Sequence, residues 1–204
     1  MPECLSGGKR AVRLILASAS PRRTQLLAQI GVPHEVVPAQ LIEQRETGES
    51  ITACVQRLAE SKALQVFGRL CAREPLWVLG ADTAVALDGR MLGKPRDERD
   101  GLEMLASLSG RTHQVLSAVA LADAGGVRSA LSVSQVQLRR IAPAEAARYW
   151  ASGEPCDKAG AYAIQGLGAI FVQTLQGSYS GVMGLPLFET ALLLEQTGVA
   201  LWGA

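Results

Sequence analysis

The chain has 204 residues, with 20 lysines and arginines, 19 acidic residues and a formal net charge of +1. This length is enough for one large α/β domain or two small ones with a sizeable core. The near balance of charge argues against a general nucleic-acid partner and against attraction to an anionic membrane, so any basic cluster must be local.

The cysteines and the N-terminus narrow the class of protein further. The four cysteines lie far apart and match no zinc or redox spacing, which is typical of reduced thiols in the cytoplasm. The first residues contain no apolar stretch long enough for a signal peptide or a membrane span. We therefore expect a cytoplasmic protein with a flexible extension over residues 1–10 and a single domain over residues 11–204.

Apolar runs alternate with helical patterns along the chain. They predict strands over 12–17, 34–38, 76–81, 83–87, 114–123, 129–139 and 168–174, and helices over 21–30, 50–72, 97–108, 143–152 and 186–197. The strand and helix alternation at the front predicts parallel pairing, whereas the turn-forming DAGG at 123–126 predicts an antiparallel hairpin. The expected fold is a mixed α/β sheet with flanking helices.

The stretch LASASPRR, residues 16–23, passes from a buried strand into a helix. Ser20 is the predicted N-cap and Pro21 the first helical residue. Arg22 and Arg23 then lie in the first turn, where the helix dipole disfavours each cation by roughly 0.3–1 kcal/mol. We expect a compensating phosphate chain, bound by the two guanidinium groups, free N–H groups and the hydroxyls of Ser18 and Ser20. The alternative is that the arginines reach solvent or pair with surface carboxylates.

A lysine falls within the apolar stripe of the second predicted helix. Lys62 is flanked on a helical wheel by Ile51, Val55, Leu58 and Val66. A lysine at such a position either extends its ammonium to solvent or meets an anion.

Two more charged residues follow the next predicted strand. Asp82 interrupts a run of apolar residues, where an uncompensated carboxylate is costly. Its expected partner is a metal or a cation, or its pKa is raised; a structural salt bridge or a local turn bond with Thr83 is the alternative. A carboxylate beside the arginines and lysines suits hydrolysis of a phosphoanhydride with a divalent cation. Lys94, after a predicted turn at 88–90, carries little information alone.

The segment DKAGAYAIQGLG, residues 157–168, is rich in glycine, which allows the backbone to approach a ligand closely. Lys158 is a candidate phosphate contact, and the Gln165 amide could pair with a base edge. It would match uracil or thymine, and a flipped amide would match cytosine or a purine. Neither a complete dinucleotide-binding glycine motif nor a P-loop is present.

Several of these motifs, in this order, resemble the Maf-type nucleoside triphosphate pyrophosphatases. The similar segments are LASASPRR, RLAESKA, GADT, GKP, GEPCDKAGAYAIQGLG and GSYSGVMGLP. The resemblance as a whole extends from about residue 12 to 198. The resemblance implies a Maf/Ham1-like α/β fold with an elongated mixed sheet, two lobes around a central cleft, and a homodimer.

The same resemblance implies roles for individual residues. Asp82 would be the catalytic base or a metal-associated carboxylate, and Glu43 a second metal ligand, at a position where the family often has two adjacent acids. Substrate choice would depend on Arg22, Thr83 and Gln165, and phosphate binding on Ser18, Ser20, Arg23, Lys62, Lys94 and Lys158.

The form AYAIQG, at 161–166, is similar to the branch of the family that acts on dTTP and UTP. The implied reaction gives a nucleoside monophosphate and pyrophosphate, with Mg²⁺ or Mn²⁺ as the cofactor, and removes unwanted nucleotides. Two alternatives stay open: a pyrophosphatase for 7-methyl-GTP or another modified purine triphosphate, and a nucleotide-binding regulator of septum formation without catalysis.

Overall fold

The computed structural model describes residues 12–70 and 76–203. Seven strands form one mixed sheet in the order β2-β1-β3-β5-β6-β7, and β4 pairs with β3 outside this path. β1 is parallel to β2 and β3, and the other pairs are antiparallel. The strands are β1 Arg13–Leu16, β2 Glu35–Val36, β3 Leu76–Leu87, β4 Arg90–Leu92, β5 Thr112–Asp123, β6 Gly126–Leu138 and β7 Val172–Gln176.

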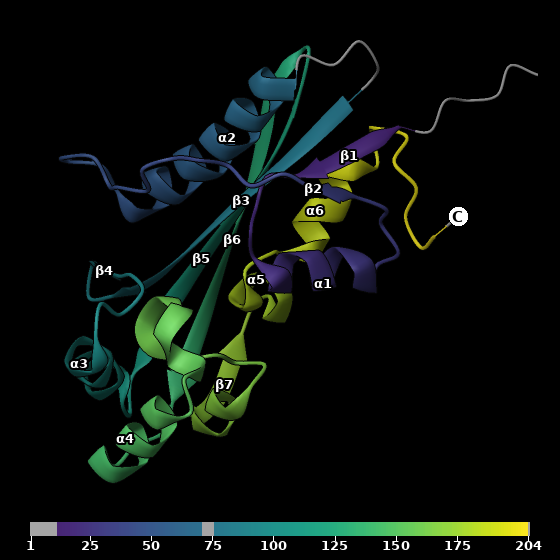
Figure 1. Ribbon diagram of the computed structural model, residues 1–204. Coiled ribbons are helices and arrows are strands. Elements are labelled where there is room, and N and C mark those ends of the chain that lie inside the picture. The colour runs from purple at the N-terminus through teal and green to yellow at the C-terminus, as the bar shows by residue number, and fades with distance from the viewer. Residues whose placement is uncertain (1–11, 71–75, 204) are drawn as a thin grey trace, which may run out of the picture.

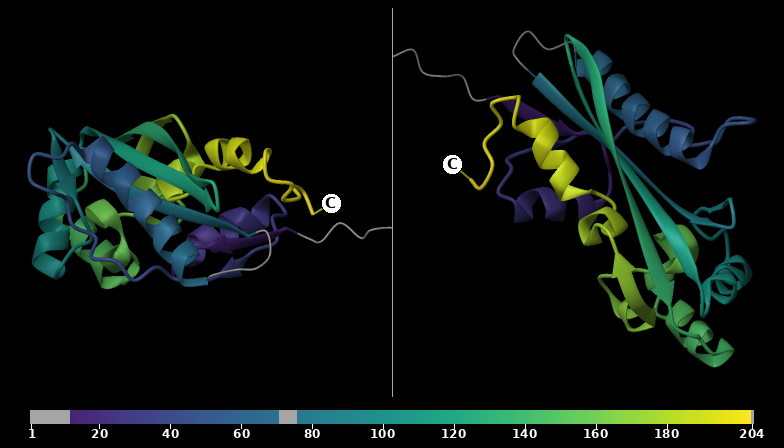
Figure 2. Two further views of the ribbon diagram at one scale, coloured as in Figure 1. Left: turned by 90° about the horizontal axis from the view of Figure 1, so that it is seen from above. Right: turned by 180° about the vertical axis from the view of Figure 1, so that it is seen from behind.

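The helices gather at the two ends of the long strands β3, β5 and β6 (Figure 1). At one end α2 covers one face of the sheet, with α1 and α6 on the other; α3 and α4 lie at the opposite end, as the view from behind also shows (Figure 2). The elements are α1 Pro21–Gln29, α2 Ile51–Leu70, α3 Glu98–Leu108, α4 Pro143–Ala151, α5 Tyr179–Met183, α6 Leu187–Leu194 and the 3₁₀ turns η1 Glu154–Asp157, η2 Ala159–Ala161 and η3 Leu167–Phe171.

The mixed α/β sheet with flanking helices is confirmed, as are the parallel pairing at the front and the hairpin at DAGG, where Asp123 pairs with Gly126. The residues predicted as strands at 76–81 and 83–87 are in β3, but the break predicted between them is wrong, because β3 continues through Asp82 as one strand. The strand predicted at 168–174 begins only at Val172, after the turn η3, and the last helix ends at Leu194 rather than residue 197.

Some short elements were not predicted, and some predictions concern residues outside the described part of the chain. β4 and α5 were not predicted, because each is very short. The expected flexible extension over residues 1–10 lies outside the described residues, and the single domain over residues 11–204 stays a prediction. Cys54 and Cys156 are free thiols, and Cys4 and Cys71 lie outside the described part of the chain.

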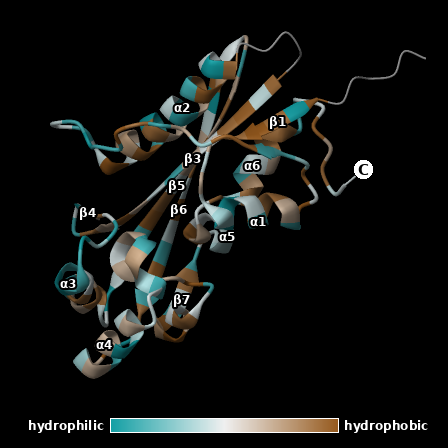
Figure 3. Cartoon of the chain, viewed as in Figure 1, coloured by the Kyte–Doolittle hydropathy of each residue, from teal (hydrophilic) through white to brown (hydrophobic). Residues whose placement is uncertain are grey.

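The sheet is buried on both faces at the α2 end. In β1, Ile15 belongs to the cluster beneath α2, whereas its neighbours Leu14 and Leu16 belong to the cluster beneath α1 and α6. A strand covered on both sides requires apolar residues at successive positions, which explains the apolar run LIL at residues 14–16. Figure 3 shows hydrophobic residues along β1 and both kinds of residue along α2. A third cluster packs beneath α3 and α4 at the other end.

The close contact between α2 and β3 depends on Gly80. A Cβ atom there would lie 2.2 Å from the Ala59 carbonyl oxygen, which belongs to the helix backbone. We expect Gly80→Ala to lower the free energy of unfolding by about 1–3 kcal/mol, since helix and strand must separate. Urea denaturation measures this change. Gly68→Ala on α2, whose Cβ would meet no atom within 4 Å, should instead stabilise the helix by about 0.5–1 kcal/mol. Equal effects at the two positions would contradict the packing described.

Among the residues described, none of the helices combines the length and the apolar character that a membrane crossing requires.

Candidate functional site

A cavity of about 340 Å³ opens between the part of the molecule that carries α1, α2 and α6 and the part that carries α3 and α4. Its wall comes from the segment between β1 and α1, the middle of β3, the loop after β4, the segment 157–165 and the end of α5. Every residue predicted for substrate or metal binding lines this cavity: Ser18, Ser20, Arg22, Arg23, Glu43, Lys62, Asp82, Thr83, Lys94, Lys158 and Gln165. Their convergence is therefore a property of the fold, whereas their individual roles stay predictions.

Two carboxylates converge on one buried ammonium group. Lys62 Nζ, on α2, lies 2.7 Å from Asp82 Oδ1 on β3 and 2.8 Å from Glu43 Oε1. Lys62 and Asp82 are each 5% exposed, so the lysine meets an anion on the buried face of its helix. The salt bridge given above as the alternative for Asp82 is present, and it lies inside the cavity. Burial raises the pKa of Asp82 and outweighs the attraction of Lys62 and Arg23.

Arg23 is held in one orientation by two neighbours. Its Nε donates to the Gly184 carbonyl at 2.8 Å, and its Nη1 donates to Ser18 Oγ at 3.0 Å. Burial lowers the pKa of this guanidinium. Ser20 occupies the N-cap position before Pro21, as predicted, but its side chain makes no capping bond. Its own N–H donates to Ser18 Oγ at 3.2 Å instead, so Ser18 joins the start of the helix to Arg23.

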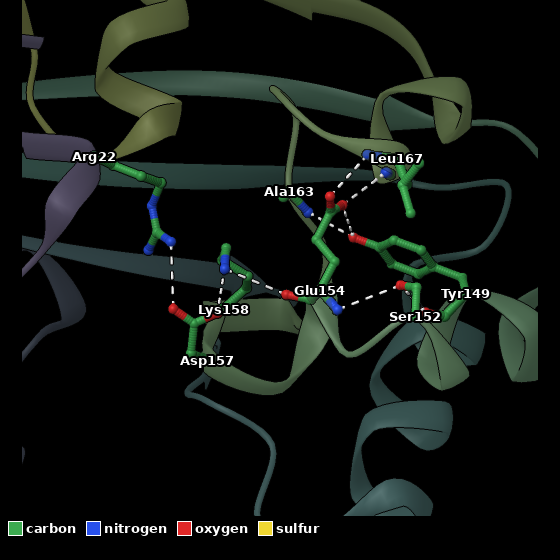
Figure 4. A network of polar contacts seen from close by, with 9 residues as sticks. Arg22, Tyr149, Ser152, Glu154, Asp157, Lys158, Ala163 and Leu167 are labelled. Atoms are coloured by element: carbon green, nitrogen blue, oxygen red, sulfur yellow. Dashed lines mark hydrogen bonds and ion pairs between the residues drawn. The ribbon is translucent and has the colours of Figure 1, made fainter. Parts of the chain in front are cut away.

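Arg22 reaches across the cavity toward the segment η1. Its Nη1 lies 3.4 Å from Asp157 Oδ2, and Lys158 pairs with the same carboxylate (Figure 4). Lys158 also donates from Nζ to the Glu154 carbonyl at 3.3 Å. Arg22 thus satisfies the alternative in which an arginine pairs with a surface carboxylate. Asp157, which joins the two cations, was not identified from the sequence.

Thr83 belongs to a chain of hydroxyl groups that was also missed. Ser117 lies opposite Thr83 in the pairing of β3 with β5. Ser117 Oγ donates to the Gly181 carbonyl at 2.6 Å, so the Thr83 hydroxyl, 2.9 Å away, is its donor. This chain holds α5 against the sheet beside Gly184. No local pattern marks Ser117, because only the strand register brings it beside Thr83.

The two remaining predicted residues lie on exposed loops. Lys94 follows β4, and Gln165 lies between the turns η2 and η3. Both are exposed and both line the cavity. A ligand in the cavity can therefore reach both side chains, which come from separate segments of the chain.

A buried histidine supports the wall near Tyr162. His113 is 2% exposed, and its Nε2 lies 2.8 Å from the Tyr162 hydroxyl; Tyr162 lines the cavity. Burial lowers the pKa of His113 to about 4. In an unfolded chain histidine titrates near pH 6.5, so the unfolded state takes up the proton first and the folded state loses stability as the pH falls from about 6.5 toward 4.

We expect this histidine to make unfolding easier in acid. Between pH 7 and pH 4.5 the wild type should lose about 2 kcal/mol more of its unfolding free energy than His113→Gln, because glutamine cannot bind the proton. Urea denaturation of both proteins at the two pH values measures the difference. An equal pH dependence in the two proteins would mean that His113 is already charged in the folded state.

The carboxylates of Asp82 and Glu43 suit a divalent cation only if a phosphate ligand supplies some of the other oxygens. Among the described residues, no group of three or more histidine, cysteine, aspartate or glutamate side chains is placed to hold a metal ion. Asp82 and Glu43 nevertheless already direct one oxygen each at a single cation, Lys62 Nζ. Mg²⁺ commonly binds one or two carboxylates and takes its other oxygens from water and substrate phosphates. The two residues therefore fit a metal that arrives with a phosphate ligand.

Comparison with known proteins identifies close relatives over nearly the whole chain. A dTTP/UTP pyrophosphatase of Saccharophagus degradans is 53% identical over 197 residues, which cover 96% of this chain and 93% of that protein. Proteins of the same name from Methylococcus capsulatus and Yersinia pestis are each 52% identical, and the matches cover 92% and 89% of this chain and 92% and 91% of those proteins.

A solved structure resembles the chain more distantly. It is a nucleoside-triphosphatase, or dITP/XTP pyrophosphatase, of Mycobacterium abscessus, with 18% identity and a TM-score of 0.44 over 90% of this chain and 94% of that one. The profile of the family described as Maf-like protein matches residues 13–197. With this match and relatives about half identical to it, the chain belongs to the Maf-like protein family.

Proposed function

We propose that this protein hydrolyses dTTP and UTP to the nucleoside monophosphate and pyrophosphate, and so removes these triphosphates from the nucleotide pool. Three relatives named dTTP/UTP pyrophosphatase, each at least 52% identical, support the substrate and the reaction. The observation that carries the proposal is the cavity itself, in which one buried carboxylate lies among cations from four separate segments. This arrangement suits attack of water on a polyphosphate.

Asp82 is the proposed general base. In the free protein Lys62 lies 2.7 Å from one oxygen of this carboxylate and holds it inside the cavity. Asp82 would take the proton of a water molecule that attacks the α-phosphorus, and the bond from that phosphorus to the bridging oxygen would break. A base placed in this way contributes about 10²–10⁴-fold to the rate.

The cations would bind the triphosphate and stabilise the leaving pyrophosphate. Arg23 is oriented in advance by Gly184 and Ser18, so it loses little freedom when it binds a phosphate. Lys94 and Lys158 would reach the same chain of phosphates from the other side of the cavity. Arg22 and Lys158, which share Asp157 in the free protein, would exchange this carboxylate for substrate oxygens.

A divalent cation, Mg²⁺ or Mn²⁺, is the proposed cofactor. When bound, it would neutralise charge on the phosphates, with Asp82 and Glu43 as its protein ligands. Lys62 would then move from the two carboxylates toward a phosphate. The charge of Asp82 and Glu43 would thus be balanced by Lys62 in the free protein and by the metal when the metal is bound.

Base selection is assigned to Gln165 together with Thr83 and Arg22. The Gln165 amide presents a donor and an acceptor side by side, and thymine and uracil present a carbonyl beside an N–H. An amide that is held in this orientation pairs less well with a base that offers the opposite pattern. The homodimer and the cytoplasmic location expected from the sequence also stay predictions.

Pyrophosphate release from a panel of triphosphates tests this function. The panel contains dTTP, UTP, CTP, 7-methyl-GTP and ITP, each with Mg²⁺, with Mn²⁺ or with a chelator. We expect turnover of dTTP and UTP that depends on the metal and is lost with the chelator. Preferred turnover of 7-methyl-GTP or ITP would assign the protein to a different substrate class, and tight binding without any turnover would favour a regulatory role.

A further inference from the structure

The loop that carries Gln165 is attached to one carboxylate and one phenol. Glu154 Oε2 accepts from the Leu167 N–H at 2.8 Å, and Glu154 Oε1 accepts from the Gly168 N–H at 3.0 Å. On the other side of Gln165, the Ala163 N–H donates to the Tyr149 hydroxyl oxygen at 3.0 Å. The loop is therefore held by its backbone on both sides of the residue assigned to base selection (Figure 4).

The two anchoring groups are themselves bonded to each other. The Tyr149 hydroxyl donates to Glu154 Oε1 at 2.7 Å. Tyr149 lies on α4 and is 6% exposed, and burial raises its pKa, so the phenol keeps its proton. Burial raises the pKa of Glu154, but the hydrogen bonds from Gly168, Tyr149 and Leu167 lower it by more. The pKa is therefore below its ordinary value, and the carboxylate stays ionised. An ionised acceptor with three donors is a strong attachment.

The loop lies against these anchors without spare room. A Cβ atom on Gly166 would lie 2.0 Å from Glu154 Oε2, and a Cβ atom on Gly168 would lie 2.6 Å from the Tyr149 hydroxyl oxygen. Glycine is thus required at both positions for the backbone to approach the anchors. Neither Glu154 nor Tyr149 is among the described residues that line the cavity, so both act on a ligand only through the loop.

We propose that Glu154, supported by Tyr149, is a positioning residue for base selection, because it fixes the backbone on which Gln165 meets the base. This proposal rests on the proposed function and deepens it. A loop held by two N–H bonds to one carboxylate fixes the backbone from which the Gln165 side chain extends, and a preorganised residue discriminates between bases better than one on a mobile loop.

The test compares dTTP with CTP in Glu154→Gln. The amide that replaces the carboxylate has one oxygen acceptor, so one of the two loop N–H groups loses its partner. We expect the ratio of kcat/KM for dTTP to kcat/KM for CTP to fall about tenfold. The loss should arise mainly from a higher KM for dTTP, with kcat within about threefold of wild type, since the phosphate end of the cavity is unchanged.

A double-mutant cycle with Gln165→Ala separates positioning from general damage. If Glu154 acts through Gln165, both single variants reduce the ratio, and the double variant reduces it no further than Gln165→Ala alone. Glu35→Gln is the matched control, because Glu35 on β2 also pairs through its carboxylate, with Arg13 at 2.9 Å, and neither residue lines the cavity. It should alter stability and leave the ratio unchanged.

Three results would overturn the proposal: an unchanged ratio in folded Glu154→Gln, an additive double variant, or an unchanged ratio in Gln165→Ala. If Glu154→Gln does not fold, Tyr149→Phe carries the same prediction, since it removes the acceptor of the Ala163 N–H. Wild-type protein that hydrolyses neither dTTP nor UTP would instead refute the proposed function, so the two failures are distinguishable.

Discussion

Replacing Asp82 with asparagine is expected to reduce turnover of dTTP by about 10²–10⁴-fold, because the amide cannot take a proton from the attacking water. Triphosphate binding should change little, since the arginines and lysines remain. The variant should still fold, because the Lys62 ammonium keeps Glu43 as a partner at 2.8 Å. The loss of one partner of the buried pair should lower the free energy of unfolding by less than Lys62→Met does.

Asp88→Asn is the matched control for this variant. Asp88 lies six positions further along, is exposed and pairs with Arg111 at 2.6 Å, outside the cavity. The same chemical change there should leave turnover within about twofold of wild type. Steady-state pyrophosphate release and calorimetric binding of a non-hydrolysable triphosphate measure the two effects. Near-normal turnover in Asp82→Asn would refute the assignment of the base.

Replacing Lys62 with methionine is expected to have the largest combined effect on stability and activity. The change leaves Asp82 buried without its nearest cation, and removal of one partner of a buried pair costs about 3–5 kcal/mol. Activity should also fall by at least about tenfold, because Asp82 becomes harder to ionise when its ammonium neighbour is lost. Urea denaturation and dTTP turnover measure the two losses.

A second substitution separates these two effects. In Lys62→Met combined with Asp82→Asn, the buried charge is gone, so we expect most of the lost stability to return while activity stays absent. Arg69→Met on the exposed side of α2 is the control and should change the unfolding free energy by less than about 0.5 kcal/mol. No recovery in the double variant would show that Lys62 stabilises the fold through packing rather than through its pair with Asp82.

The course of β3 shows where sequence reasoning reaches its limit. Asp82 within LWVLGADTAVAL was interpreted as a break between two strands, because a lone carboxylate is unfavourable in a buried strand. In the structure Lys62 supplies the opposite charge from a helix 20 residues earlier, so the strand continues. The partner that makes Asp82 acceptable is a tertiary contact, and the pattern of the strand alone does not contain it.

The site residues divide in a similar way. The residues that face the cavity, such as Arg23 and Lys62, were predictable because a charge in an apolar stripe or at the wrong end of a helix conflicts with its surroundings. The residues that support them were missed. Ser117 and Glu154 are ordinary for their local segments, and their importance depends on strand register and on a loop that folds back over η1. Local conflict therefore reveals the residues that line the cavity better than it reveals the residues that support them.

The products formed from dTTP show which phosphorus atom the water attacks. The protein is incubated with dTTP and the metal, and the nucleotide and phosphate products are separated and quantified. Attack at the α-phosphorus predicts one dTMP and one pyrophosphate for each dTTP consumed, with ¹⁸O from labelled water in the dTMP. Formation of dTDP and inorganic phosphate, or the label in pyrophosphate, would contradict the proposed place of attack.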